Sequence, residues 1–296
     1  MNERERPPAV IAGVDGTAGA RAALGWAIEA AARRRVQLRI VHGLGPATVI
    51  GAAAADRRTA DGVRASAHEL LTESAEYARA ARPDIEVVTV LAVADAPAVL
   101  LEEARHGDVI AVGSRGLGSV RAIMLGSVGM HTSANAPCPV VVVPDVESRG
   151  YRGRVVVGVD GSPSSRRALR FALEEALTTD ASVVLVHALG DDAPAEDEAI
   201  DDEVLDRQSE EVVGGVLAEV IDERTEHLDI SAVRVRADSV EALLEAGAEA
   251  DMIVVGSRGR GGVRGLVLGS VSQGVLHHAG IPVAVLPPHA DEDGTD

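Results

Sequence analysis

Short apolar runs alternate with longer segments of helical periodicity along the chain, and the whole series occurs twice. In the first half the runs lie near residues 9–14, 36–42, 85–91, 108–113 and 139–143. In the second half they lie near residues 154–159, 182–187, 229–236, 251–256 and 282–286. The runs are continuous in valine and isoleucine rather than alternating, which is typical of parallel strands buried on both faces. Helices are predicted between them, near 18–34, 60–81, 96–106 and 127–135 in the first half.

Strand–helix alternation with right-handed crossovers predicts a doubly wound, Rossmann-like α/β sheet in each half. A chain of 296 residues is long enough for two domains of ordinary size. A polar interruption near residues 144–151 separates the two copies. We therefore expect two tandem five-stranded parallel sheets, in domains spanning residues 1–147 and 148–296.

Two duplicated motifs follow strands in both halves. The first strand ends in Asp15-Gly16-Thr17, and its counterpart 145 positions later ends in Asp160-Gly161-Ser162. The fourth strand runs into Gly113-Ser-Arg-Gly116, nine residues and Gly126-Ser127, and the copy reads Gly256-Ser-Arg-Gly259, nine residues and Gly269-Ser270. Glycine lets the backbone approach phosphate oxygens, and a following helix offers unpaired N–H groups. A single such loop is more often an ordinary tight turn, but the matched repetition favours an anion-binding loop in each half.

Polar residues at the predicted helix starts have structural interpretations. Thr17 and Ser162 are expected N-caps, with Pro163 at the first helical position of the second copy. Asp95 and Asp238 occupy matching positions before the third helix of each half, where a capping role is favoured over a catalytic one. Residues 43–59 and the acidic segment 191–211 are expected to be long loops, the acidic one a solvated face.

Composition excludes several classes of function. The net charge of −18 argues against nucleic acid or an anionic membrane as partner, and aromatic residues for base stacking are scarce. All 28 basic residues are arginines, so the lysine of a Walker loop and a Schiff-base lysine are both absent. The single cysteine, Cys138, is expected to be a small core residue. No signal-like or membrane-spanning apolar run is present, so a cytoplasmic location is expected.

Ligands of open parallel sheets bind beyond the carboxyl ends of the strands, where the strand order reverses. With a strand order of 3-2-1-4-5, Asp15 and the loop at Gly113 meet at that point. Arg115 and Arg258 then supply positive charge, and a divalent cation relieves the same repulsion of a polyanion.

The second strands contribute two further candidate residues in each half. Val41 and Val186 are taken as the ends of these strands, with a backbone that holds an adenine edge. The alternative is that both valines belong only to the core, and that His42 and His187 are solvent-exposed strand-end residues. His131, His277 and His278 have no repeat-matched role and are interpreted as surface residues.

The tandem pattern of both motifs resembles the universal stress protein family, in particular its ATP-binding branch, over nearly the whole chain. The resemblance implies a 3-2-1-4-5 sheet with ATP, accompanied by Mg2+ or Mn2+, at each reversal of strand order. In the first domain it implies phosphate and ribose contacts at Gly113, Ser114, Arg115, Gly116, Gly118, Ser119, Gly126, Ser127 and Val128, and nucleoside contacts at Gly13, Asp15 and Val41. In the second domain the implied residues are Gly256, Ser257, Arg258, Gly259, Gly261, Gly262, Gly269, Ser270 and Val271, with Gly158, Asp160 and Val186. The second loop departs from the first in having Gly261-Gly262 where the first has Gly118-Ser119, which removes one hydroxyl.

The favoured function is an ATP-binding regulatory protein of the stress response rather than a turnover enzyme, because no base beside a nucleophile and no metal triad is evident. A slow ATPase or adenylyl-transfer enzyme that uses the same crevices is the enzymatic alternative, with Asp15 and Asp160 as metal ligands. A third alternative is an interaction module that uses neither site. The family also pairs domains through the last strand, so residues 140–143 and 283–286 are expected to pair within the chain or in a homodimer.

Overall fold

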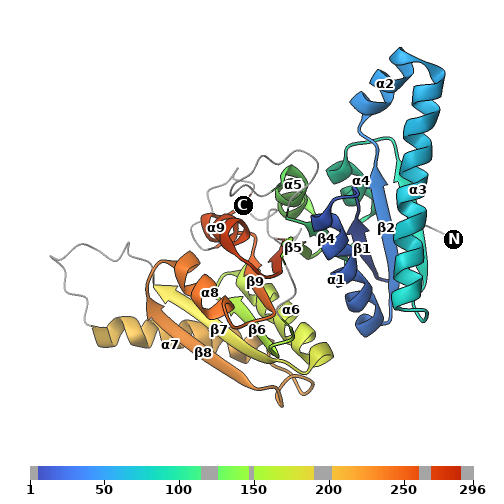
Figure 1. Cartoon of the computed structure of the whole chain (residues 1–296). Coiled ribbons are helices and arrows are strands. Elements are labelled where there is room, and N and C mark those ends of the chain that lie inside the picture. Colours follow the sequence, from blue (N-terminus) through green and yellow to red (C-terminus); the bar gives the residue numbers. More distant parts are fainter. Residues whose placement is uncertain (1–5, 115–125, 147–149, 190–201, 260–267, 288–296) are drawn as a thin grey trace. The chain divides into compact units, whose positions relative to one another are not determined.

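The computed structural model describes residues 6–114, 126–146, 150–189, 202–259 and 268–287 (Figure 1). The chain divides into two compact units, residues 1–145 and 146–296. Each unit is an α/β sheet built from one copy of the sequence repeat.

Unit 1 contains a five-stranded parallel sheet of order β3-β2-β1-β4-β5. Its strands are β1 (Ala9–Gly13), β2 (Gln37–Gly43), β3 (Val87–Ala92), β4 (Val109–Gly113) and β5 (Val140–Val143). The order reverses between β1 and β4, as predicted. The carboxyl ends of these two strands therefore lie side by side.

The described helices of unit 1 are α1 (Ala18–Arg34), α2 (Pro46–Ala55), α3 (Arg57–Ala81), α4 (Ala96–Glu103) and α5 (Ser127–Asn135). Helices α1 and α3 pack on one face of the sheet, and α4 and α5 cover the other (Figure 1). The core of the first face joins Leu24 and Ile28 of α1 with Leu38 and Ile40 of β2 and Leu71 of α3. Because aromatic residues are scarce, aliphatic side chains fill these layers.

Unit 2 repeats the arrangement with the order β8-β7-β6-β9-β10, again parallel throughout. Its strands are β6 (Arg154–Gly158), β7 (Ser182–Leu189), β8 (Ile230–Arg236), β9 (Met252–Gly256) and β10 (Val283–Leu286). Its described helices are α6 (Pro163–Thr179), α7 (Asp202–Val220), α8 (Ser239–Gly247) and α9 (Ser270–His278). Counted within its own unit, this order is again 3-2-1-4-5.

In each unit, an aspartate at a matching position accepts hydrogen bonds from backbone groups at the amino ends of the strands. This end of the sheet is opposite to the carboxyl edge. In unit 1 the buried Asp108 accepts hydrogen bonds from the backbone N–H of Ala9 at 2.8 Å and from that of Arg105 at 2.9 Å, and it pairs with Arg6 at 2.6 Å. In unit 2 Asp251 accepts from the N–H groups of Arg152 and Arg154, at 2.7 and 3.0 Å. These carboxylates satisfy backbone donors where β1 and β6 begin, far from the carboxyl edge.

The two segments expected to be long loops are partly helical. Residues 46–55, expected to be loop, form α2, which packs against α3. Residues 202–211, expected to be loop, belong to α7, and the remainder of that acidic segment lies outside the described residues. The alanine-rich 46–55 segment has high intrinsic helix propensity, which outweighs its glycine.

Helix starts confirm most of the predicted caps. The Thr17 and Ser162 hydroxyls accept from the N–H groups of Ala20 and Ser165, and Asp238 accepts from two N–H groups of α8. Asp95 occupies the N-cap position of α4 as predicted, but its side chain accepts no capping hydrogen bond from the described residues. In the described part of the chain, no helix is both long enough and apolar enough to cross a membrane.

Candidate nucleotide site

A tight turn after the first strand of each unit fixes an aspartate at the carboxyl edge. Asp15 Oδ1 accepts from the Thr17 N–H at 3.0 Å and from the Thr17 hydroxyl at 2.6 Å. Asp160 Oδ1 accepts from the Ser162 N–H at 2.9 Å. The intervening Gly16 and Gly161 have φ of 82° and 77°, a region that favours glycine. The carboxylates are thereby held beside the starts of α1 and α6.

The glycine loop and the aspartate turn meet in both units, as the predicted strand order requires. A β-carbon on Gly113 would lie 2.5 Å from the backbone carbon of Gly19, in the first turn of α1. A β-carbon on Gly256 would lie 2.7 Å from Ser164 Cβ, in the first turn of α6. In unit 2 the contact reaches the carboxylate itself, because a β-carbon on Gly259 would lie 2.6 Å from Asp160 Oδ2.

These distances give the first glycine of each loop a packing role. Gly113 and Gly256 admit the helix that follows the first strand, which no larger residue would allow. Their predicted part in bending around phosphates is not required to explain why they are glycines. Gly13 and Gly158 likewise face Leu100 and Leu243, with a β-carbon at 3.4 and 3.3 Å.

The two ends of each glycine loop are joined by a hydrogen bond. The Gly126 N–H donates to the Ser114 carbonyl at 2.8 Å, and the Gly269 N–H donates to the Ser257 carbonyl at 2.7 Å. The N–H groups of these N-cap glycines are therefore used within the protein. Neither α5 nor α9 has a side-chain cap, so the donors that remain for an anion are those of the first helical turns, beginning at Ser127 and Ser270. Val128 and Val271 follow directly in these turns.

Two buried polar groups at the start of the unit 2 loop lack a partner among the described residues. Ser257 is 1% exposed, and its hydroxyl forms no hydrogen bond within this part of the chain. The Arg258 Nε is also buried without a partner, and this guanidinium forms no ion pair with any residue that the structure describes. Buried donors without an acceptor are destabilising. Their position beside the N-terminus of α9 therefore suits a site in which an anion accepts these hydrogen bonds.

Several predicted site residues lie outside the described residues. These are Arg115, Gly116, Gly118 and Ser119 in unit 1 and Gly261 and Gly262 in unit 2. Their assignments therefore remain predictions.

Val41 and Val186 do not lie at the ends of their strands. Strand β2 continues to Gly43 and β7 continues to Leu189. Both valines are 2% exposed, and their carbonyls accept from the N–H groups of Val14 and Val159 at 2.9 Å. The expectation that they end the strands is wrong, because the chain stays in the sheet beyond each valine. One lone pair of each carbonyl is used by the residue after β1 or β6, and the assignment of these valines to an adenine edge remains a prediction.

The histidines that follow these valines have matching contacts that sequence reasoning missed. His42 Nδ1 lies 2.7 Å from the Val14 carbonyl oxygen, and His187 Nδ1 lies 2.7 Å from that of Val159. His187 is buried, so its interpretation as a solvent-exposed residue is wrong. The available signal was their separation of 145 residues, which equals that of the two aspartates.

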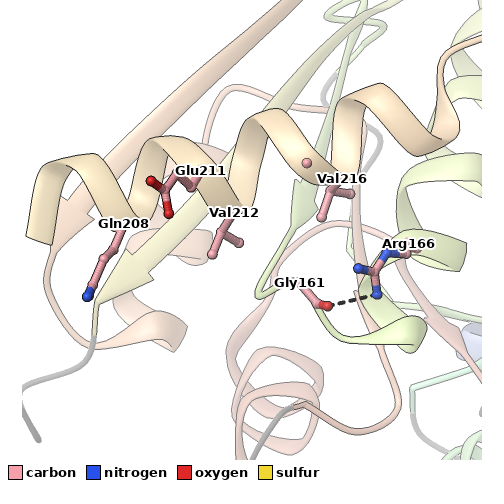
Figure 2. Close-up of a pocket in the computed structure, with 7 residues that line it drawn as sticks. Gly161, Arg166, Gln208, Glu211, Val212 and Val216 are labelled. Carbon is pink, nitrogen blue, oxygen red and sulfur yellow. Dashed lines mark hydrogen bonds between the residues drawn. The ribbon is translucent and has the colours of Figure 1, made fainter.

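A hollow of about 520 Å³ opens beside the aspartate turn of unit 2 (Figure 2). This volume lies within the usual range of small-molecule sites. Helix α7 forms one wall, and the turn at Gly161 with the first turns of α6 forms the other. The lining residues are Gly161, Arg166, Gln208, Glu211, Val212, Gly215 and Val216.

The charge of Arg166 is neutralised locally. Its guanidinium pairs with Glu219 at 2.5 Å and donates to the Gly161 carbonyl at 2.9 Å. Glu211 adds a carboxylate at the rim, while Val212 and Val216 make the lining apolar. The hollow therefore suits an uncharged group better than a phosphate.

Within the described residues, no group of three or more histidine, cysteine, aspartate or glutamate side chains is arranged to hold a metal ion. In Asp15 and Asp160, one carboxylate oxygen already accepts a hydrogen bond from a backbone N–H of the adjacent turn.

Comparison with known proteins agrees with this duplicated architecture. The model of the universal stress protein family matches residues 8–144 and again residues 152–287. The chain belongs to the universal stress protein family. A universal stress protein of Mycobacterium tuberculosis strain H37Rv is 30% identical, over 96% of this chain and 99% of its own. A second universal stress protein of that strain is 31% identical, over 93% and 95%.

Solved structures show the same fold. The crystal structure of a universal stress protein from Archaeoglobus fulgidus superposes with a TM-score of 0.71, at 23% identity, over 94% of this chain and 98% of that one. The match spans both units of this universal stress protein, so its tandem α/β fold occurs in a solved relative.

Proposed function

We propose that this universal stress protein is an ATP-binding regulatory protein with one nucleotide site in each unit. The observation that carries the proposal is the contact of Gly259 with Asp160, next to the uncapped start of α9 and the unpartnered groups of Ser257 and Arg258. An aspartate turn, a glycine loop and a free helix N-terminus together form a site for a phosphorylated ligand.

The phosphates are assigned to the first turns of α5 and α9, where N–H donors and the positive end of the helix dipole are free. In unit 2 the Arg258 guanidinium and the Ser257 hydroxyl add donors. The hollow beside Gly161 provides room for the nucleoside, since the charge of Arg166 is already paired and the lining is partly apolar. A divalent cation bound to ATP would reduce the charge that enters a protein of net charge −18.

Calorimetric titration of the full chain with ATP, ADP, AMP and adenosine tests this assignment. The affinity is expected to fall in that order, because each phosphate removed loses contacts with a helix N-terminus. Arg258→Gln should weaken ATP binding by about tenfold, the cost of one charge-assisted hydrogen bond. Arg170→Gln, an exposed arginine on α6, is the matched control and should leave the affinity unchanged. Equal affinity for ATP and adenosine would refute the phosphate assignment.

The enzymatic alternative uses the same crevices, with Asp15 and Asp160 holding a metal for slow ATP hydrolysis or adenylyl transfer. It predicts multiple turnovers that disappear in the combined variant Asp15→Asn with Asp160→Asn. The interaction-module alternative predicts that freshly purified protein releases no nucleotide on denaturation and binds none by calorimetry. Mass spectrometry of the released small molecules separates these alternatives from the regulatory proposal.

A further inference from the structure

One side-chain hydrogen bond recurs at the same place in both units. His42 Nδ1 lies 2.7 Å from the Val14 carbonyl oxygen, and His187 Nδ1 lies 2.7 Å from the Val159 carbonyl oxygen. A carbonyl oxygen only accepts, so the ring nitrogen must be the donor. The contact therefore fixes Nδ1 as the protonated nitrogen of each ring.

In each unit, the valine before the aspartate has both of its backbone polar groups hydrogen-bonded to the second strand, and the histidine provides one of these two bonds. We call this pair of hydrogen bonds a clamp. The Val14 N–H donates to the Val41 carbonyl at 2.9 Å, while the Val14 carbonyl accepts from the next residue, His42. The Val159 N–H and carbonyl are held in the same way by Val186 and His187. Both polar groups of this residue thus face the second strand of its unit.

This clamp sets the direction of the aspartate amide. The Val14 carbonyl and the Asp15 N–H belong to one trans peptide plane, in which they point in opposite directions. Because β2 and β4 flank β1 on opposite sides, a carbonyl directed at β2 turns the Asp15 N–H toward β4 and its glycine loop. The Asp15 N–H donates to no residue that the structure describes.

The surroundings make the hydrogen bond effective. His187 is only 6% exposed, so water does not compete freely for its ring or for the carbonyl that it holds. His42 continues the face of β2 that carries Leu38 and Ile40, which packs beneath α1 and α3. Each ring is therefore anchored in its unit.

We propose that His42 and His187 are positioning residues of the two nucleotide sites, which hold the peptide before each aspartate so that its N–H and carboxylate face the glycine loop. The inference rests on the proposed ATP site but concerns residues that contact the protein rather than the ligand. It requires the Nδ1 donor and not merely a ring that fills the space.

Substitution of the histidines by asparagine or by glutamine distinguishes a requirement for the Nδ1 donor from a requirement for a side chain that fills the space. The Asn amide nitrogen occupies the position of Nδ1 and can donate to the same carbonyl, whereas the Gln amide nitrogen corresponds to Nε2. Full-length His42→Asn with His187→Asn should bind ATP within about threefold of the wild type. Full-length His42→Gln with His187→Gln should bind about tenfold more weakly, since one hydrogen bond is lost at each site, part-buried in unit 1 and buried in unit 2. Equal affinity in both variants, whether retained or lost, would overturn the proposal.

Hydrogen–deuterium exchange of ligand-free protein provides a readout that does not depend on ATP. Peptides covering residues 14–18 and 159–163 should exchange faster in the Gln variant than in the wild type, and at the wild-type rate in the Asn variant. Unchanged exchange in the Gln variant would overturn the positioning role. If the wild type bound no ATP, the proposed function would fail, while the exchange comparison would still decide whether the histidines hold these turns.

Discussion

A β-carbon added to Gly259 would lie 2.6 Å from Asp160 Oδ2, so the glycine loop and the aspartate turn of unit 2 are in direct contact. The two residues come from the ends of β9 and β6, neighbouring strands at the point where the sheet order reverses. This contact explains why the loop carries a glycine here: any side chain must displace the carboxylate.

Gly259→Val is expected to weaken ATP binding at the unit 2 site by at least about tenfold, because the new side chain pushes the Asp160 carboxylate out of its turn. Adding Gly116→Val should impair the unit 1 site in the same way, because Gly116 is the counterpart of Gly259 in the repeated motif. Calorimetry gives both the affinity and the number of sites. Gly214→Val is the control for valine at an exposed glycine with open space around it. Unchanged affinity in the double variant would show that these loops are not the binding site.

Gly215→Leu is expected to weaken ATP binding in unit 2 by filling the hollow beside Gly161. Its neighbour Gly214 is also exposed on α7, does not line the hollow, and would have no atom within 4 Å of an added β-carbon. Both substitutions replace a helical glycine and should stabilise the unit by up to about 1 kcal/mol. Only Gly215→Leu should change the affinity. The same loss in Gly214→Leu would mean that the nucleoside lies elsewhere.

Asp108→Ala is expected to destabilise unit 1 by about 3–5 kcal/mol, because it leaves Arg6 and two backbone N–H groups without their buried acceptor. Asp251→Ala removes only backbone contacts and should cost about 1–3 kcal/mol. Urea unfolding followed by circular dichroism measures both changes. Nucleotide affinity should not change, since both carboxylates lie at the amino ends of the strands. Equal costs would contradict the importance of the Arg6 pair.

Cys138 is expected to resist alkylation in the folded protein. Burial, with a smaller effect of the Asp108 charge, raises the pKa of its thiol from 9.0 to about 12. At pH 8 iodoacetamide should therefore react only after unfolding, which mass spectrometry detects. Because the folded pKa is the higher one, this group's contribution to stability is complete below pH 9 and is lost as the pH rises toward about 12. Cys138→Ala should abolish that part of the pH dependence, and an unchanged pH profile would show that the thiol is not responsible.

The fold could be predicted because its signals are local and duplicated. Continuous valine-rich runs such as 140–143 identify buried parallel strands, and Thr17 and Ser162 identify helix starts. The failures came where a local signal was ambiguous. The alanines of segment 46–55 favour a helix, whereas its proline and glycine are common in loops, and the contact with α3 supports the helix.

The site was predicted less completely, for reasons of geometry. Strand order brings Asp160 to the glycine loop, and this could be reasoned from the sequence. The partners of His42 and His187 could not, because a side chain that bonds across strands leaves no periodic pattern. The α7 wall of the hollow was also missed, since Gln208 and Glu211 lie in the acidic segment that was expected to be a loop.

The hydrogen bond between the Gly269 N–H and the Ser257 carbonyl, like its counterpart from Gly126 to Ser114, has a consequence for affinity. It brings the two ends of each loop together without a ligand. The entropic cost of closing the loop is therefore part of folding and not of ligand binding. At the proposed sites, a nucleotide would therefore bind a loop whose ends are already joined, and less of its contact free energy would be lost to ordering the loop.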